Sequence, residues 1–123
     1  MTLVADLLVA SGATTGSILR YSTGRFVSKI VDTDFPWGTW IINMVGAFLL
    51  GLFFREIWIT EHSLNWWLFL GTGFCGGFTT FSAMSIDTVR LLRFNRVLAI
   101  IYLGSSISIG CLLAWLPTLF SYL

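Results

Sequence analysis

Long apolar stretches dominate the chain and alternate with short polar segments. The stretches without any charged residue are 37–54, 63–86 and 97–123. A fourth stretch, residues 2–19, carries only Asp6. Each of the four approaches or exceeds the roughly 18 apolar residues from which a bilayer-spanning helix is inferred. Because the segments between them are too short to fold separately, the pattern predicts an all-α protein with four transmembrane helices and one domain, residues 1–123.

The composition supports a membrane protein. Hydrophobic residues make up 56% of the 123 residues and charged residues only 11%, whereas soluble domains are about 25% charged. No Lys or Arg precedes Arg20, so the basic segment of a cleavable signal peptide is missing and the first helix is expected to remain. A net charge of +1 without a basic cluster argues against nucleic-acid binding. Lipid is the expected environment.

The third stretch contains Gly73-Phe-Cys-Gly-Gly-Phe-Thr-Thr-Phe-Ser82, which a plain lipid-facing helix does not need. Each glycine lowers helix propensity by about 1 kcal/mol relative to alanine. A helix break near Gly76 and Thr79 would free backbone carbonyls at mid-membrane depth, where such oxygens bind sodium in other membrane proteins. The alternative is that the glycines only permit close helix packing. The spacing leaves both interpretations open.

Small residues elsewhere predict close helix contacts. Residues 11–17 of the first stretch are all Gly, Ala, Ser or Thr. In the second stretch, Ala47 and Gly51 lie one turn apart on one face. Small side chains let two backbones approach each other inside a membrane. Both segments are therefore expected to lie in helix interfaces.

Several uncharged polar residues fall within the apolar stretches. Asn43 lies in the middle of the second, where an unsatisfied amide is costly, so a partner or a water-filled path is expected. Tyr102 and Ser106 lie one turn apart in the fourth stretch, and their hydroxyls would line one track with those of Thr80 and Ser82. The alternative for each aliphatic hydroxyl is a bond to a carbonyl of the preceding turn.

Phe74, Phe78 and Phe81 recur at i, i+4 and i+7, so they would share one face of a continuous helix. Ordinary packing against the core or lipid is one explanation. The other is that positive ring edges face a small anion. Periodicity alone does not separate the two.

No Lys, Arg, Asp, Glu or His lies deep in the second, third or fourth stretch, so a proton-coupled mechanism lacks an evident central carrier. The sequence also has no set of nucleophile, base and orienting acid, no cluster of metal ligands and no phosphate-binding loop. It therefore predicts that the protein is not an enzyme.

Three segments resemble the small bacterial fluoride channels of the CrcB or Fluc family. They are Gly12-Ala-Thr-Thr-Gly-Ser-Ile-Leu-Arg-Tyr21, Gly38-Thr-Trp-Ile-Ile-Asn-Met-Val-Gly-Ala-Phe48 and the glycine-threonine segment 73–82. The resemblance covers essentially the whole chain, including the order of the helices.

This resemblance implies a fluoride-selective channel that exports fluoride passively from the cytoplasm across the bacterial inner membrane. The expected assembly is an antiparallel, dual-topology homodimer with a broken third helix, two fluoride pathways and a central structural sodium ion. Backbone carbonyls of Gly76 and Thr79 would hold the sodium. Arg20 would lie at an aqueous vestibule. The fluoride pathway would contain Asn43 as a donor, Phe81 as a ring edge, and Thr80, Ser82, Tyr102 and Ser106 as the polar track.

Two positions depart from the family pattern. The family usually has a second phenylalanine where this chain has Met84, and often a glutamate where it has Asp87. A thioether lacks the positive edge of an aromatic ring. Met84 is therefore expected either to serve in the pathway in place of the ring or to alter transport.

The distribution of basic residues conflicts with dual topology. Six of them lie in or near the loops that follow the odd-numbered helices: Arg20, Arg25, Lys29, Arg90, Arg93 and Arg96. Only Arg55 lies on the opposite side. Basic loops normally stay in the cytoplasm, so this bias favours one orientation, with both termini outside.

Two other functions fit four short helices. A small multidrug-resistance-type transporter would need a membrane-embedded carboxylate in its first helix, and Asp6 is the candidate. A structural subunit that pairs with an oppositely oriented paralogue would instead account for the charge bias.

Overall fold

A computed structural model describes residues 2–59 and 64–120, and over these residues the chain contains helices and connecting loops but no strand. The elements are α1 (Leu3–Ile30), α2 (Trp37–Phe53), the π-helix η1 (Phe54–Ile59), α3 (Leu64–Trp66), the π-helix η2 (Trp67–Cys75), α4 (Gly76–Phe78), α5 (Phe81–Leu92) and α6 (Arg96–Leu119). The all-helical prediction is confirmed for the described residues.

Local sequence signals account for several helix ends. The Thr2 hydroxyl accepts a hydrogen bond from the Ala5 N–H at the start of α1, and the Asn95 side chain does the same for the Leu98 N–H at the start of α6. Such caps satisfy N–H groups that have no helical acceptor. Pro36, whose missing N–H is not needed there, immediately precedes α2.

Within residues 2–59 and 64–120, three continuous helices are long and apolar enough to cross a membrane: Leu3–Ile30, Trp37–Ile57 and Arg96–Leu119. The remaining predicted span is divided into the run α3, η2 and α4, and the separate helix α5. The chain is therefore a multi-pass membrane protein in which one of the apolar stretches is interrupted.

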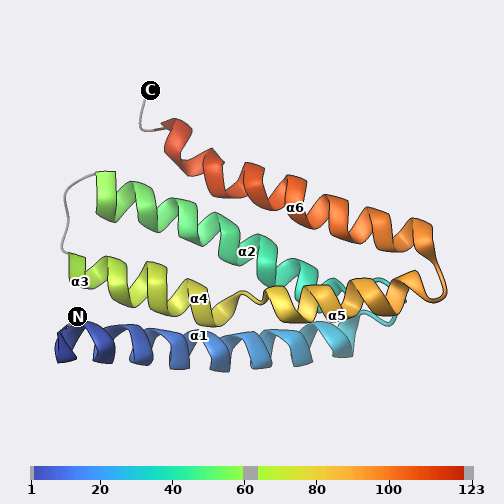
Figure 1. The fold of residues 1–123 in the computed structure, drawn as a ribbon, viewed down its shortest axis with the longest axis horizontal. Helices are drawn as coiled ribbons and strands as arrows, with labels where there is room; N and C mark the ends of the chain where they lie inside the picture. The colour runs from blue at the N-terminus through green and yellow to red at the C-terminus, as the bar shows by residue number, and fades with distance from the viewer. Residues whose placement is uncertain (1, 60–63, 121–123) are drawn as a thin grey trace.

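The helices form an elongated bundle (Figure 1). Helix α1 packs along η2 and α4, and α6 packs along α2 and against α5. Helix α1 begins at the same end of the bundle at which α6 finishes (Figure 1). The loop before α2 and the turn between α5 and α6 lie at the other end.

Glycines bring α1 and the interrupted span into backbone contact. A Cβ added to Gly12 would overlap the carbonyl oxygen of Phe69 in η2, and one added to Gly77 would overlap the carbonyl oxygen of Ala13 in α1. The prediction of close packing by the small residues of the first helix is confirmed. Gly51 likewise meets the backbone of Ala114 in α6, as predicted for the small stripe on α2.

One buried hydrophobic cluster lies between α5 and α6. It contains Met84, Leu91, Ala99 and Tyr102, against which Phe35 and Trp40 pack. Many large apolar side chains elsewhere, such as Leu7 on α1 or Ile100 and Leu112 on α6, are exposed. Their number is typical of helices that face lipid.

Candidate functional site

The interrupted span is broken at two threonines. Helix α4 ends at Phe78 and α5 begins at Phe81, while Thr79 (φ −81°, ψ 159°) and Thr80 (φ −149°, ψ 114°) between them have extended backbone. The break lies where the sequence predicted it. We refer to Thr79 and Thr80 as the polar break.

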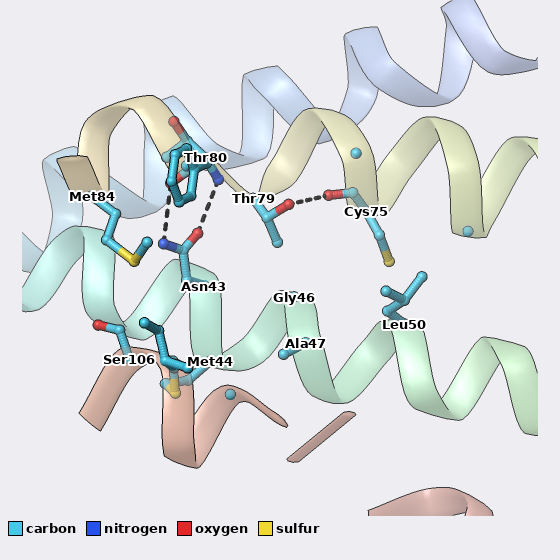
Figure 2. A pocket seen from close by; sticks show the side chains of 15 residues that line it. Asn43, Met44, Gly46, Ala47, Leu50, Cys75, Thr79, Thr80, Met84 and Ser106 are labelled. Carbon is cyan, nitrogen blue, oxygen red and sulfur yellow. Dashed lines mark hydrogen bonds between the residues drawn. The ribbon is translucent and has the colours of Figure 1, made fainter. Parts of the chain in front are cut away.

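Asn43 of α2 binds the polar break through both ends of its amide. Its Nδ2 donates to the Thr80 carbonyl oxygen at 3.2 Å, and its Oδ1 accepts from the Thr80 N–H at 2.9 Å (Figure 2). The amide has two N–H groups, and this pairing uses one. The expected partner of Asn43 is therefore the backbone of the break.

The break frees carbonyl groups that would accept hydrogen bonds from backbone N–H groups in a continuous helix. In an α-helix the Thr80 N–H would bond to the Gly76 carbonyl, but here it bonds to Asn43. The Gly77 carbonyl accepts from the Ser17 hydroxyl at 3.4 Å, and the Thr79 carbonyl accepts from Arg20 Nη1 at 3.5 Å. Side chains from α1 and α2 thus replace part of the missing helical bonding.

The two interpretations of the glycines apply to different glycines. Gly73 and Gly77 have no room for a Cβ, since backbone atoms of α1 lie too close. A Cβ on Gly76 would meet nothing within 4 Å. Gly73 and Gly77 therefore serve helix packing, whereas Gly76 presents its backbone to open space beside the break.

A cavity of about 400 Å³ lies alongside the polar break; we call it the break cavity. It is lined by Gly76, Thr79, Thr80, Phe81 and Met84 of the interrupted span, by Asn43 and its neighbours on α2, and by Ser106, Ile107 and Gly110 of α6. None of the described residues that line it is charged. Figure 2 shows Asn43 pointing toward Thr80, with Met84 and Ser106 nearby.

A second cavity, of about 850 Å³, lies on the other side of the break, and we call it the basic cavity. Its charged lining residues are Arg20, Arg25, Lys29, Asp87 and Arg90. Thr80 lines both cavities, and Ser82 lines the basic cavity. Four cationic side chains against one carboxylate give this cavity a positive potential that attracts anions.

The hydroxyls of the predicted track differ in their bonding. Ser106, 6% exposed, donates to the Tyr102 carbonyl at 2.6 Å, as in the simpler alternative. Thr80 and Ser82 pair through their hydroxyl oxygens at 3.1 Å, and Thr80 Oγ1 also accepts from the Ala83 N–H at the start of α5. Thr80 and Ser82 therefore provide a pair of hydroxyl groups where the two cavities adjoin.

Tyr102 lies apart from both cavities. It is fully buried, and its ring meets Phe35 edge-on with centroids 5.4 Å apart. Its hydroxyl, which has no hydrogen-bond partner among the described residues, lies beside Asp87 and Thr39. Thr39 was not predicted to belong to the site, although it lies one turn before Asn43 on α2 and this spacing could have indicated it.

The condition for a shared phenylalanine face, a continuous helix, is not met. Phe74 and Phe78 stack with ring centroids 5.8 Å apart, but Phe81 follows the break, where a continuous helical face no longer exists. Phe81 is 77% exposed at the edge of the break cavity. Met84, one turn further along α5, is only 8% exposed and lines the same cavity.

The sequence matches a family described as "CrcB-like protein, Camphor Resistance (CrcB)" over residues 7–118. The matched range includes the three segments on which the resemblance was based. It also covers every residue predicted for the site.

Individual relatives are similar over most of their length. The "Fluoride-specific ion channel FluC" of Flavobacterium psychrophilum is 40% identical over 110 residues, which are 87% of this chain and 88% of the relative. A protein of the same name from Thermus thermophilus is 43% identical over 111 residues (89% and 87%). "Fluoride-specific ion channel FluC 2" of Rhodococcus jostii is 41% identical over 113 residues (89% and 92%). These names describe ion channels, in agreement with the prediction that the chain is not an enzyme.

Proposed function

Because this chain belongs to the CrcB-like protein family, we propose that it is a fluoride-selective ion channel of the bacterial cytoplasmic membrane. Relatives that align with most of this chain are named fluoride-specific ion channels. The observation that carries the proposal is the uncharged break cavity, which meets the basic cavity at Thr80.

This arrangement suits a small anion. Fluoride holds its hydration water tightly, so a pathway must supply donors in place of water without a fixed cation that would trap the ion. The second N–H of Asn43 and the hydroxyls of Thr80, Ser82 and Ser106 are neutral donors. We propose that they lead fluoride past the polar break, with the Phe81 ring edge and Met84 at its side, whereas Tyr102, which lines neither cavity, supports the track from behind.

The basic cavity serves as the vestibule in this proposal. Arg20, Arg25 and Lys29 are side chains of α1 that line it, and their positive potential raises the local anion concentration without placing a cation in the break cavity. Arg20 is the basic residue nearest the break, because its guanidinium reaches the Thr79 carbonyl.

A structural sodium ion fits the polar break. Hard cations take oxygen ligands, and the break supplies the carbonyls of Gly76, which has lost its helical donor, and Thr79. Among the described residues no group of three His, Cys, Asp or Glu side chains offers an alternative metal site. A bound sodium would supply positive charge and tie the two carbonyls together.

We further propose an antiparallel homodimer with two pathways. Two carbonyls from one chain are too few for a hard cation, and a second copy would complete the set. The exposure of Phe81 and the open space over Gly76 leave room for such a copy beside the break. In the cell, the inside-negative potential would drive fluoride outward through either pathway.

The transporter alternative finds little support. Asp6 is exposed in the first turn of α1 rather than buried within the bundle. A carboxylate in that place is favoured simply by the positive end of the helix dipole. A paralogue-dependent subunit would instead insert in one orientation only, as its charge bias favours.

The proposal is tested by ion efflux from liposomes that contain the purified protein. Potassium fluoride is loaded inside, valinomycin makes potassium permeant, and a fluoride electrode records efflux; chloride-loaded liposomes and protein-free liposomes are the controls. We expect rapid fluoride efflux and no chloride efflux.

The variant Met84→Phe separates a general failure from a local one. Efflux from the variant alone would mean that the methionine closes an otherwise competent channel. If well-folded dimers of both proteins fail to release fluoride, the channel proposal is wrong.

A further inference from the structure

Two side chains of α1 reach carbonyl groups of the interrupted span. Ser17 donates to the Gly77 carbonyl and Arg20 to the Thr79 carbonyl, at 3.4 and 3.5 Å. The two residues are three positions apart and lie on one face of α1. One donor is neutral and the other carries a full positive charge, so they act differently on any cation at the break.

The Thr79 carbonyl has two possible cationic partners. It is one of the two sodium ligands proposed above, and the inference here rests on that part of the proposed function. Arg20 already donates to the same oxygen. A guanidinium does not lose its proton in proteins, so its charge persists at every accessible pH.

Repulsion between the two cations is stronger here than in water. Arg20 is only partly exposed, on the side of the basic cavity. Between charges in or near a protein the effective dielectric constant is several times lower than that of water. The guanidinium also draws electron density from the carbonyl that would bind the ion.

We infer that Arg20 sets the sodium affinity of the polar break, by competing with the ion for the Thr79 carbonyl. Arg20 is thus a tuning residue for the cation site as well as a residue of the vestibule. Coupling between two ligands is reciprocal, so a bound sodium displaces the guanidinium toward the basic cavity. There it adds to the potential that attracts anions.

The test measures sodium affinity directly and does not depend on transport. The thermal unfolding midpoint of the purified dimer in detergent is followed against NaCl concentration, with N-methylglucamine chloride keeping ionic strength constant. A ligand that binds only the folded state raises this midpoint according to its dissociation constant. We expect Arg20→Gln to bind sodium about tenfold more tightly than the wild type, because a unit charge next to the site is removed.

Three further variants make the result specific. Ser17→Ala removes the neutral donor to the adjacent carbonyl, and Arg25→Gln removes a cation of the basic cavity that has no bond to the break. Both are expected to keep sodium affinity within about threefold of the wild type, because Ser17 carries no charge and screening weakens the effect of the more distant Arg25. Arg20→Met, which keeps the apolar stem, replaces Arg20→Gln if that variant does not fold.

The outcomes are distinct. Tighter sodium binding that occurs in a neutral Arg20 variant, but not in Ser17→Ala or Arg25→Gln, supports the inference. Unchanged or weaker binding in that variant overturns it, as does an equal gain in Arg25→Gln, which would indicate a general charge effect. A wild-type protein that ignores sodium overturns the inference together with the sodium site, while fluoride efflux still decides the channel proposal independently.

Discussion

At the scale of single residues, Asn43 has two tasks that the sequence does not separate. Its amide pairs with both backbone groups of Thr80 and thereby holds the break in its extended conformation. Only the N–H that this pairing leaves over is proposed to donate to fluoride. The same side chain therefore contributes to the stability of the break and to its function.

We predict that Asn43→Ala weakens the break and suppresses fluoride efflux. Each lost hydrogen bond costs about 1 kcal/mol, and more where a buried group stays unpaired. Amide hydrogen exchange at Thr80 should therefore rise by about fivefold or more, and efflux should fall severely.

Val45→Ala is the matched control, because Val45 is an exposed apolar residue of the same helix. It should change neither quantity. Undiminished efflux from folded Asn43→Ala dimers would remove Asn43 from the pathway, and unchanged exchange at Thr80 would contradict its structural task.

At the scale of elements, the contact between α1 and the interrupted span depends on the absence of side chains. Gly12 and Gly16 of α1 face backbone atoms of η2 and α4, and Gly77 faces the backbone of Ala13. Backbone atoms cannot turn aside as a flexible side chain can. The two elements are consequently held in one register, which aligns Ser17 and Arg20 with the carbonyls of the interrupted span.

We predict that Gly77→Ala destabilises the protein by about 1–3 kcal/mol, the usual cost of an overpacked interface. The measurement is the unfolding midpoint in detergent. Gly104→Ala on α6 is the matched control, because a Cβ there meets nothing within 4 Å in the chain, and alanine favours a helix by up to about 1 kcal/mol. Equal midpoints for Gly77→Ala and the wild type would show that the interface relaxes without cost.

At the scale of the whole molecule, the one-sided distribution of basic residues conflicts with a dual topology. Lys29 lies in the last turn of α1, Arg90 in the last turn of α5 and Arg96 at the start of α6, and these helix ends lie at one end of the bundle (Figure 1). Arg55 directly follows α2, whose C-terminal end lies at the opposite end. An antiparallel dimer would give both membrane surfaces the same charge. A single orientation would instead place all of the basic ends in the cytoplasm.

Orientation is measured with one accessible cysteine. In a Cys75→Ala, Cys111→Ala background, Asp32→Cys places a thiol in the exposed loop before α2. A membrane-impermeant maleimide is applied to intact cells and, as the control for total thiol, to permeabilised cells.

For a dual-topology protein we expect about half of the thiol to be labelled from outside, since both orientations insert despite the charge bias. Complete labelling, or none, in intact cells would overturn the antiparallel homodimer. That result would favour a subunit that needs an oppositely oriented partner.

Much of this protein is determined locally by its sequence. Apolar length alone indicates the membrane spans, and the clustered glycines and threonines of segment 73–82 indicate where one of them breaks. The small residues of the first helix indicate its packing face, as observed. These properties depend on hydrophobicity and backbone propensity, which act over a few neighbouring residues.

The tertiary structure decides what depends on contacts between distant segments. It pairs Asn43 with Thr80, separates the packing glycines from Gly76, sets Tyr102 beside Thr39 and Asp87, and directs Arg20 to the Thr79 carbonyl. Helical periodicity does not fix the rotation and register of one helix against another. Those follow only when the close glycine contacts and the broken span are packed together, and the polar break acquires its partners at that stage.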